Sequence, residues 1–277
     1  METKNETRVS TWRDCEQRLL QIEKDNSNSL TGVWFRGVSN AKWKLTTTLE
    51  RRVSQPFSVA EYFQLMSRIK PEIETFTGKS WEVSEWSEPE PGTDFGCYFR
   101  RHPALTFMTH LRHCGFSSPI LDWSRSPYVA AYFAFAKAQA ATDMACSVPG
   151  NDVAIYIFSE TPNNVKSGNA LGPKIIIHGG HSLKSHERHF RQRSSYTVCV
   201  EREASSGKWK FVSHQRIFGL NRKDQDRLYK ITVPSSERLE VLRVLDRYNL
   251  NEHSLFGSEE SLMKTLAFRE IDQKLSL

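Results

Sequence analysis

The chain has 277 residues, of which 38% are apolar, 11% aromatic and 25% charged. This balance excludes a disordered protein and predicts an ordered, soluble fold with a sizeable core, which we assign to one domain rather than two. The formal charge of +6 would attract a polyanion but does not identify one. The longest apolar stretch, residues 128–141, contains Lys137 and Gln139 and is too short to span a bilayer, so we expect no membrane contact.

Cysteine usage and the N-terminus indicate a reducing compartment. The five cysteines are odd in number, widely spaced and without a Cys-x-x-Cys pair. This spacing argues against a disulfide framework and against a zinc knuckle, and it predicts buried thiols. The first five residues form no apolar signal region, so we expect a cytoplasmic protein.

The first third of the chain predicts helices around one short strand. Residues up to about 10 are expected to be loose, and a helix follows because apolar side chains in residues 12–22 recur at helical spacing. Residues 30–35 are short, apolar and interrupted by glycine, which indicates a strand. Residues 58–76 carry apolar side chains on one helical face, Phe76 included, and predict a helix packed on the core.

A polar segment and a helix–strand pair follow. Residues 79–96 are acidic and lack a sustained period, so we interpret them as a surface insertion with Trp81 and Trp86 as candidate docking groups. Residues 104–113 predict a helix, and residues 119–121 begin a strand.

Strands dominate the second half of the chain. The expected strands are residues 153–158, 174–178, 196–200 and 228–233, and the expected helices are residues 237–248 and 261–271. The sum is an α+β fold with helices early, a largely antiparallel sheet later and no parallel βαβ alternation. We divide the chain into an N-terminal helical segment, residues 1–29, and one domain, residues 30–277.

Two short motifs carry the candidate site. Trp34-Phe35-Arg36-Gly37 places an arginine and a flexible glycine at the end of an apolar run, where a strand leaves the core and exposes a cation for a phosphate. Leu121-Asp122-Trp123-Ser124-Arg125-Ser126-Pro127 ends a strand in hydroxyl groups. It opens an alanine- and aromatic-rich helix, residues 127–141, with proline at its first turn. Small polar groups beside aromatic rings suit a nucleotide.

Several common chemistries lack their motifs. The chain has no Gly-x-Gly-x-x-Gly or Walker loop, no Gly-x-Ser-x-Gly and no His-Glu-x-x-His. Four histidines cluster in residues 178–189 without cysteine or carboxylate partners at regular spacing, so we expect no metal site there. The same run is basic, which indicates a solvated face or a contact with nucleic acid or pyrophosphate. A nuclease that uses this run is the lowest-ranked hypothesis.

A series of short motifs runs along the chain in a fixed order. It comprises Phe35-Arg36-Gly37, Trp43-x-Leu45, Leu49-x-Arg51, His113-x-Gly115, residues 121–127, Ala130-Ala131-Tyr132-Phe133-Ala134 and Arg188-x-x-x-Gln192-x-Ser194-x-Tyr196-Thr197. This series resembles the FRG domain, a family named for its Phe-Arg-Gly signature, over residues 30–266. Two departures are Pro119, where the family usually has an arginine, and Ser194, where it has glycine.

The FRG layout is in turn similar to the arginine–serine–glutamate class of ADP-ribosyltransferases. This similarity implies a split, largely antiparallel sheet with flanking helices, and transfer of ADP-ribose from NAD, the co-substrate, to a macromolecule. It implies that Arg36 clamps the NAD pyrophosphate or the nicotinamide ribose, and that Ser124 holds Arg36 or the ribose. Gln192 falls at the place of the catalytic glutamate, where it can bond a ribose hydroxyl but carries no charge. Glu201 and Gln215 are the other candidates for that role.

The resemblance also implies a set of NAD-binding residues. Tyr132 or Phe133 would stack on nicotinamide, although core packing explains aromatic residues on such a helix equally simply. Asp122 and His113 are polar residues in apolar blocks, and they orient the site or make structural bonds. Capping of the next helix is the rival role for the two serines. The whole set is Arg36, Gly37, His113, Asp122, Ser124, Ser126, Tyr132 and Phe133.

We therefore expect an NAD-dependent ADP-ribosyltransferase, a bacterial toxin or defence effector that modifies RNA, DNA or a protein. The basic run near Arg188 places nucleic acid slightly ahead of protein as the acceptor. A neutralising antitoxin protein is the expected partner. The alternative is a non-catalytic module that binds a nucleotide or a partner protein through the same pocket, and Gln192 in place of glutamate is its main argument.

Overall fold

One mostly antiparallel sheet organises the chain. The computed structural model describes residues 5–27, 32–90, 93–138, 152–160, 173–179, 187–219 and 226–274. The eight described strands have the order β1-β8-β4-β2-β3-β6-β5, with β7 paired to β6, and among them only β1 and β8 pair in parallel. The strands are β1 (Glu6–Arg8), β2 (Val33–Val38), β3 (Leu121–Ser124), β4 (Val153–Ser159), β5 (Lys174–Gly179), β6 (Ser194–Arg202), β7 (Trp209–Phe211) and β8 (Arg227–Val233). The predicted α+β class with a largely antiparallel sheet is confirmed.

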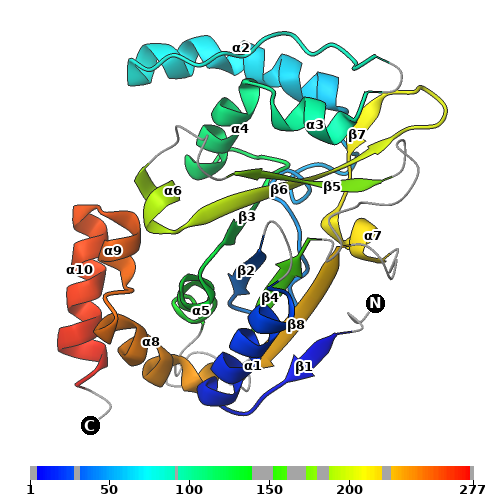
Figure 1. The fold of residues 1–277 in the computed structure, drawn as a ribbon. Coiled ribbons are helices and arrows are strands. Elements are labelled where there is room, and N and C mark those ends of the chain that lie inside the picture. Colours follow the sequence, from blue (N-terminus) through cyan, green and yellow to red (C-terminus); the bar gives the residue numbers. More distant parts are fainter. Residues whose placement is uncertain are drawn as a thin grey trace.

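Helices cover the sheet in two groups (Figure 1). The α-helices are α1 (Trp12–Asp25), α2 (Val59–Thr77), α3 (Phe95–Arg100), α4 (Ala104–His113), α5 (Pro127–Phe135), α6 (Glu187–Arg191), α7 (His214–Gly219), α8 (Arg238–Arg247), α9 (Glu252–Phe256) and α10 (Glu259–Ala267). One core joins α1, α5 and α8 to β2, β4 and β8, and a second joins α2, α3 and α4 to β5, β6 and β7. Alternate residues of β2 and β4 face a third core, because strand side chains alternate between faces.

Strand β2 pairs extensively with one neighbouring strand and at a single position with the other. Six residues of β2, from Val33 to Val38, pair with β4, but the only register pair between β2 and β3 is Phe35 with Ser124. Strand β3 instead pairs along four residues with β6. The two halves of the sheet therefore separate beside this single contact, and Arg36 and Asp122 lie at the separation.

The predicted end of the first strand was wrong, and so was the reason for Gly37. Arg36 and Gly37 lie within β2, and Gly37 has no positive φ. A Cβ atom at Gly37 would lie 1.9 Å from the carbonyl oxygen of Ala130 and 2.5 Å from the backbone nitrogen of Ala134. Glycine is thus required because α5 crosses β2 at van der Waals contact, rather than for flexibility.

Other differences between the predictions and the structure arise where the contacts join residues that are far apart in the sequence. Residues expected to be loose include β1, which pairs with β8. Phe76 is 92% exposed instead of buried at the end of α2, whose first half supplies the core. Trp81 and Trp86 are not external docking groups, because they pack against the second core and contact Phe107 and Phe63.

The structure tests in part the predictions of buried thiols and of no membrane contact. None of the four described cysteines forms a disulfide; Cys15 and Cys199 are buried whereas Cys97 and Cys114 are exposed, so burial was predicted correctly for only two of these four. Cys146 lies outside the described residues. Across the described ranges no helix has both the length and the apolar character needed to cross a membrane.

Candidate functional site

A cavity of about 430 Å³ opens where β2 and β3 separate. Its walls come from both strands, from α4, from α5, and from the segment that links α6 to β6. The lining residues that matter for chemistry are Arg36, Gly37, Trp43, Arg51, Arg112, His113, Asp122, Ser124, Phe133, Lys137, Arg188, Gln192 and Phe256. Seven predicted site residues are therefore brought together, namely Arg36, Gly37, His113, Asp122, Ser124, Phe133 and Gln192.

The cavity is strongly positive. Four arginines and one lysine line it, and Asp122 is the one carboxylate among its described lining residues. Within a low-dielectric pocket such an excess of cations attracts an anion more strongly than on an open surface. The arrangement is suited to a phosphate or pyrophosphate group, which arginine binds through several N–H donors.

Arg36 is held at the separation of the strands by Asp122. Its Nη1 donates a 2.6 Å hydrogen bond to the main-chain oxygen of Asp122 and lies 3.8 Å from Asp122 Oδ2. The Arg36 side chain is 17% exposed. Burial lowers the pKa of Arg36 to about 10, the Asp122 carboxylate opposes this shift, and Arg112 and Arg51 add to it. Arg36 therefore remains a cation at neutral pH, fixed in position.

Arg112 is the second arginine on the same carboxylate. Its Nη2 donates to Asp122 Oδ2, so one aspartate is shared by guanidinium groups from β2 and α4. Because two cations meet one anion, the cluster keeps a net positive charge. Asp122 thus positions the arginines and leaves them capacity for a further anionic partner.

Ser124 holds the backbone of the predicted catalytic residue rather than Arg36. Its hydroxyl donates a 2.8 Å hydrogen bond to the main-chain oxygen of Gln192 and accepts one of 3.0 Å from the backbone N–H of Ser126. The Ser126 hydroxyl accepts from the N–H of Val129 and caps α5. Ser126 is buried and does not line the cavity, which corresponds to the capping alternative.

Gln192 reaches the cavity from the turn before β6. Its side-chain Nε2 donates to the main-chain oxygen of Leu255 at 3.2 Å, so the amide oxygen is the group left for another donor. The rival residues are elsewhere: Glu201 lies toward the other end of β6 in an ion pair with Arg216, and Gln215 lies on α7. Neither lines the cavity.

A buried tyrosine links the cavity to a second histidine. The hydroxyl of Tyr196 lies 2.6 Å from His113 Nε2 and 2.9 Å from His189 Nδ1. Burial raises the pKa of Tyr196, and burial together with Arg125 lowers the pKa of His189. The hydroxyl therefore stays protonated between two rings, and it fixes His113 at the cavity wall.

Tyr132 and Phe133, the two candidates for stacking on nicotinamide, differ in whether they line this cavity. Phe133 lines the cavity, whereas Tyr132 is buried and its hydroxyl donates to Glu252 Oε2 in a neighbouring pocket. Trp43 and Phe256 are aromatic lining residues that were not assigned to the site from sequence. Trp43 is 54% exposed, so its ring is accessible at the cavity.

The sequence reasoning also missed most of the positive charge. Arg51 and Trp43 stood inside quoted motifs, and Arg112 directly precedes His113, but none was assigned a role. The only sequence signal for these three residues was their position within or next to the motifs that resemble the FRG domain. In the described part of the chain no three His, Cys, Asp or Glu side chains gather as a metal site, and His181 and His186 lie outside it.

The comparison with protein families agrees with the series of motifs that begins at Phe35-Arg36-Gly37. The family model of the FRG domain matches residues 31–143, and the resemblance is confirmed over that range. No curated protein and no solved structure matches the chain. The matched range supplies Arg36, Arg112, Asp122 and Ser124, whereas Arg188 and Gln192 come from beyond it.

Proposed function

We propose that the protein is an NAD-dependent ADP-ribosyltransferase whose reaction takes place in the basic cavity. The observation that carries the proposal is the convergence of Arg36, Ser124 and Gln192 on one cavity with five cationic side chains and one carboxylate. In the sequence these three residues span 156 positions, from Arg36 to Gln192. Their convergence on one cavity is what the resemblance to transferases requires.

The cavity has the chemistry that NAD needs. Its volume of about 430 Å³ falls in the usual range for small-molecule sites, about 300–1,000 Å³. The arginines match the pyrophosphate, and the rings of Trp43, Phe133 and Phe256 offer apolar faces to a flat base. Asp122 is the one carboxylate among the described residues that line this cavity.

In this proposal the chain's residues divide the work. Arg36 and Arg112, fixed by Asp122, hold the pyrophosphate so that the ribose C1′ faces the acceptor. The amide oxygen of Gln192 accepts a hydrogen bond from a ribose hydroxyl, while Ser124 holds the Gln192 backbone. When the C1′–nicotinamide bond breaks, the electron pair leaves with nicotinamide, and the acceptor nucleophile attacks C1′ and gives up its proton.

The acceptor is proposed to be a nucleic acid, RNA in the first place, with protein as the second choice. Arg188, Arg191 and Arg193 lie on or next to α6, beside Gln192. Binding of RNA should then weaken steeply with salt, because phosphate contacts release counterions. We also propose a bacterial toxin or defence role with a neutralising antitoxin, in which expression is toxic and Arg36→Ala relieves the toxicity.

A second candidate function is a non-catalytic nucleotide-binding module. One observation favours it: the only described carboxylate in the cavity is held by two arginines, and a glutamine stands at the proposed catalytic position. Such a module would bind NAD through Arg36 without releasing nicotinamide.

The experiment that tests the transferase uses labelled NAD and cell extract. The wild-type protein should transfer label, whereas Arg36→Ala and Gln192→Ala should lose it. Gln215→Ala is the matched control, because Gln215 was a rival candidate and lies outside the cavity. Label that is absent with wild type, or that persists in both cavity variants, rules out the proposed enzyme.

A further inference from the structure

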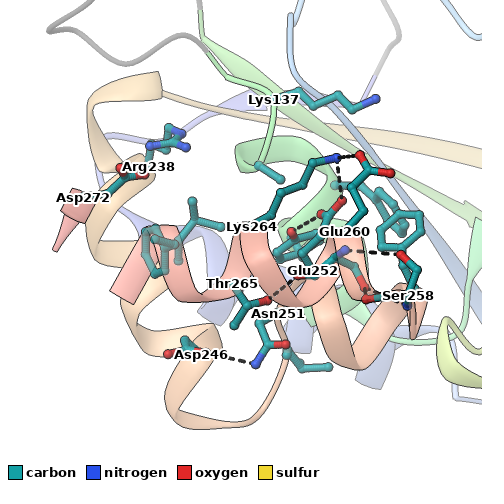
Figure 2. A pocket seen from close by; sticks show the side chains of 18 of the residues that line it. Lys137, Arg238, Asp246, Asn251, Glu252, Ser258, Glu260, Lys264, Thr265 and Asp272 are labelled. Atoms are coloured by element: carbon teal, nitrogen blue, oxygen red, sulfur yellow. Dashed lines mark hydrogen bonds and ion pairs between the residues drawn. The ribbon is translucent and has the colours of Figure 1, made fainter. Parts of the chain in front are cut away.

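A second and larger cavity lies next to the basic one. It has a volume of about 580 Å³ and is lined by residues of α5, α8, α9 and α10, whose side chains are drawn in Figure 2. The proposed reaction does not use its distinctive residues. Its apolar walls include Leu242, Leu250 and Phe268, and several charged residues also line it.

The two cavities share one wall. Phe133, Lys137, Arg188 and Phe256 line both. The guanidinium of Arg188 lies 5.4 Å from the ring centre of Phe256, and the Phe256 and Phe133 rings meet edge to face at 6.0 Å. The boundary between the cavities therefore consists of two cations and two aromatic rings.

Charge differs between the two cavities. Apart from the shared pair, the second cavity has two cations, Arg238 and Lys264, and four carboxylates. With the shared pair, the positive and negative charges are equal in number. This cavity is therefore suited to a neutral polar group rather than to a phosphate.

Glu252 is the carboxylate best placed for such a group. It is 23% exposed, its Oε2 accepts from the Tyr132 hydroxyl, and its Oε1 lies 3.9 Å from Lys264 Nζ. Lys264 is closer to Glu260, at 2.6 Å. A carboxylate can accept several hydrogen bonds, so Glu252 retains capacity for a hydroxyl donor. Asp246, by contrast, is already bonded to both Arg269 and Asn251.

We propose that the two cavities together bind one dinucleotide, with its adenosine in the second cavity and the adenosine ribose 2′-hydroxyl donating to Glu252. The pyrophosphate remains in the basic cavity against Arg36 and Arg112, and its adenosine side faces Lys137 and Arg188 at the boundary. This assignment rests on the proposed function, because it places the reacting ribose on the side of Arg36, Ser124 and Gln192. A carboxylate is a common partner for a ribose 2′-hydroxyl in dinucleotide sites.

The assignment makes the second cavity a specificity site. A 2′-phosphate would put its negative charge against Glu252, which disfavours NADP relative to NAD. The neutral adenine base matches the balanced charge of this cavity and packs on the Phe256 and Phe133 rings. Glu252 and Phe256 of this site thus lie on helices after residue 143, outside the matched FRG range, whereas Phe133 lies within it.

Calorimetric titration of the full chain tests this inference with fragments of the substrate. AMP should bind the wild type, and Glu252→Gln should weaken AMP by about tenfold, the effect of one hydrogen bond to a charged group. 2′-Deoxy-AMP should bind the wild type about tenfold more weakly than AMP, with no further loss in Glu252→Gln. Nicotinamide mononucleotide and pyrophosphate should bind both proteins equally. Glu252→Gln should also narrow the preference for NAD over NADP.

The control is Glu259→Gln, the same change at an exposed neighbour that lines neither cavity, and it should match the wild type. Ala136→Phe, which adds a ring to the second cavity alone, should block AMP while leaving pyrophosphate bound. Equal AMP affinity in wild type and both cavity variants overturns the inference, as does equal loss of AMP and nicotinamide mononucleotide. If NAD is never cleaved but the AMP pattern holds, the transferase fails and the adenosine site stands.

Discussion

Arg36 in β2 donates a 2.6 Å hydrogen bond to the main-chain oxygen of Asp122 in β3, at the point where the two strands separate. The carbonyl of Asp122 lies beyond Phe35–Ser124, the single register pair between these strands. The Arg36 side chain therefore provides this carbonyl with a donor where the strands have separated. The same contact fixes a guanidinium in a cavity with four other cations. One residue thus joins the two halves of the sheet and defines the anion site.

The first prediction concerns this anion site. Pyrophosphate should raise the Tm of the wild type, because a ligand that binds only the folded state stabilises it. Arg36→Ala should lose most of this rise. Arg8→Ala removes a 65% exposed arginine that pairs with Asp152 and should keep the full rise in a thermal melt. An equal rise in all three proteins would place the anion elsewhere.

Gly37→Ala should destabilise the fold. The new Cβ would collide with backbone atoms of Ala130 and Ala134, which cannot rotate away as a side chain can. Overpacking of this kind costs about 1–3 kcal/mol, measured as a lower free energy of unfolding in urea. Gly96→Ala is the control, since its Cβ would meet only an Asp94 side-chain oxygen at 3.2 Å. Equal unfolding free energies for the two variants would contradict the close approach of α5 and β2.

Ser124→Ala should lower both stability and turnover. It removes the hydrogen bonds to the Gln192 carbonyl and to the Ser126 N–H, and leaving such buried groups unpaired costs about 1–3 kcal/mol. The Gln192 backbone then loses its support, so kcat should fall more than KM rises. Ser195→Ala, one strand away, removes a buried hydroxyl that has no hydrogen-bond partner and should be nearly neutral. Chemical denaturation and steady-state kinetics compare the two.

Stability should fall as the pH drops below about 6.5. Burial lowers the pKa of His214 to about 3, with Arg36 adding to the shift, and burial also lowers the pKa of His189 and of His102. The unfolded chain therefore binds more protons than the folded chain in this window. For His214 the free energy of unfolding should drop by up to about 1.4 kcal/mol per pH unit between pH 6.5 and its folded-state pKa, and His189 and His102 add to the fall in the same direction.

The pH profile has an internal check. His214 is buried and accepts or donates one bond to Thr197 at 2.7 Å, while its Nδ1 has no partner. His214→Gln should flatten the profile between pH 6.5 and 5.5 relative to the wild type. A profile that is unchanged by the substitution, or a wild type that gains stability in acid, would contradict the assignment.

Much of the fold was predictable because its signals are local. The helix at Ala104–His113 was placed at its observed bounds, since helical periodicity and the following Gly115 both lie within one short window. The sheet class followed from runs of β-branched and aromatic residues such as those in β4 and β8. The capping role of Ser126 was likewise readable from Ser126 and Pro127.

The rest depends on contacts between distant residues. Strand β1 has three residues and becomes a strand only because β8 is present to pair with it. Arg112 and Arg188 belong to the cavity through the packing of α4 and α6, which no local pattern encodes. Gly37 was recognised as special, but its reason lies in α5, more than ninety residues away along the chain, at Ala130.

The most direct test of the central claim is the rate of nicotinamide release from NAD by the purified protein. The proposal predicts release by wild type and by Arg8→Ala, and a loss of about a hundredfold or more in Arg36→Ala, as for removal of a key electrostatic donor. No release by wild type, or equal release by wild type and Arg36→Ala, would contradict it.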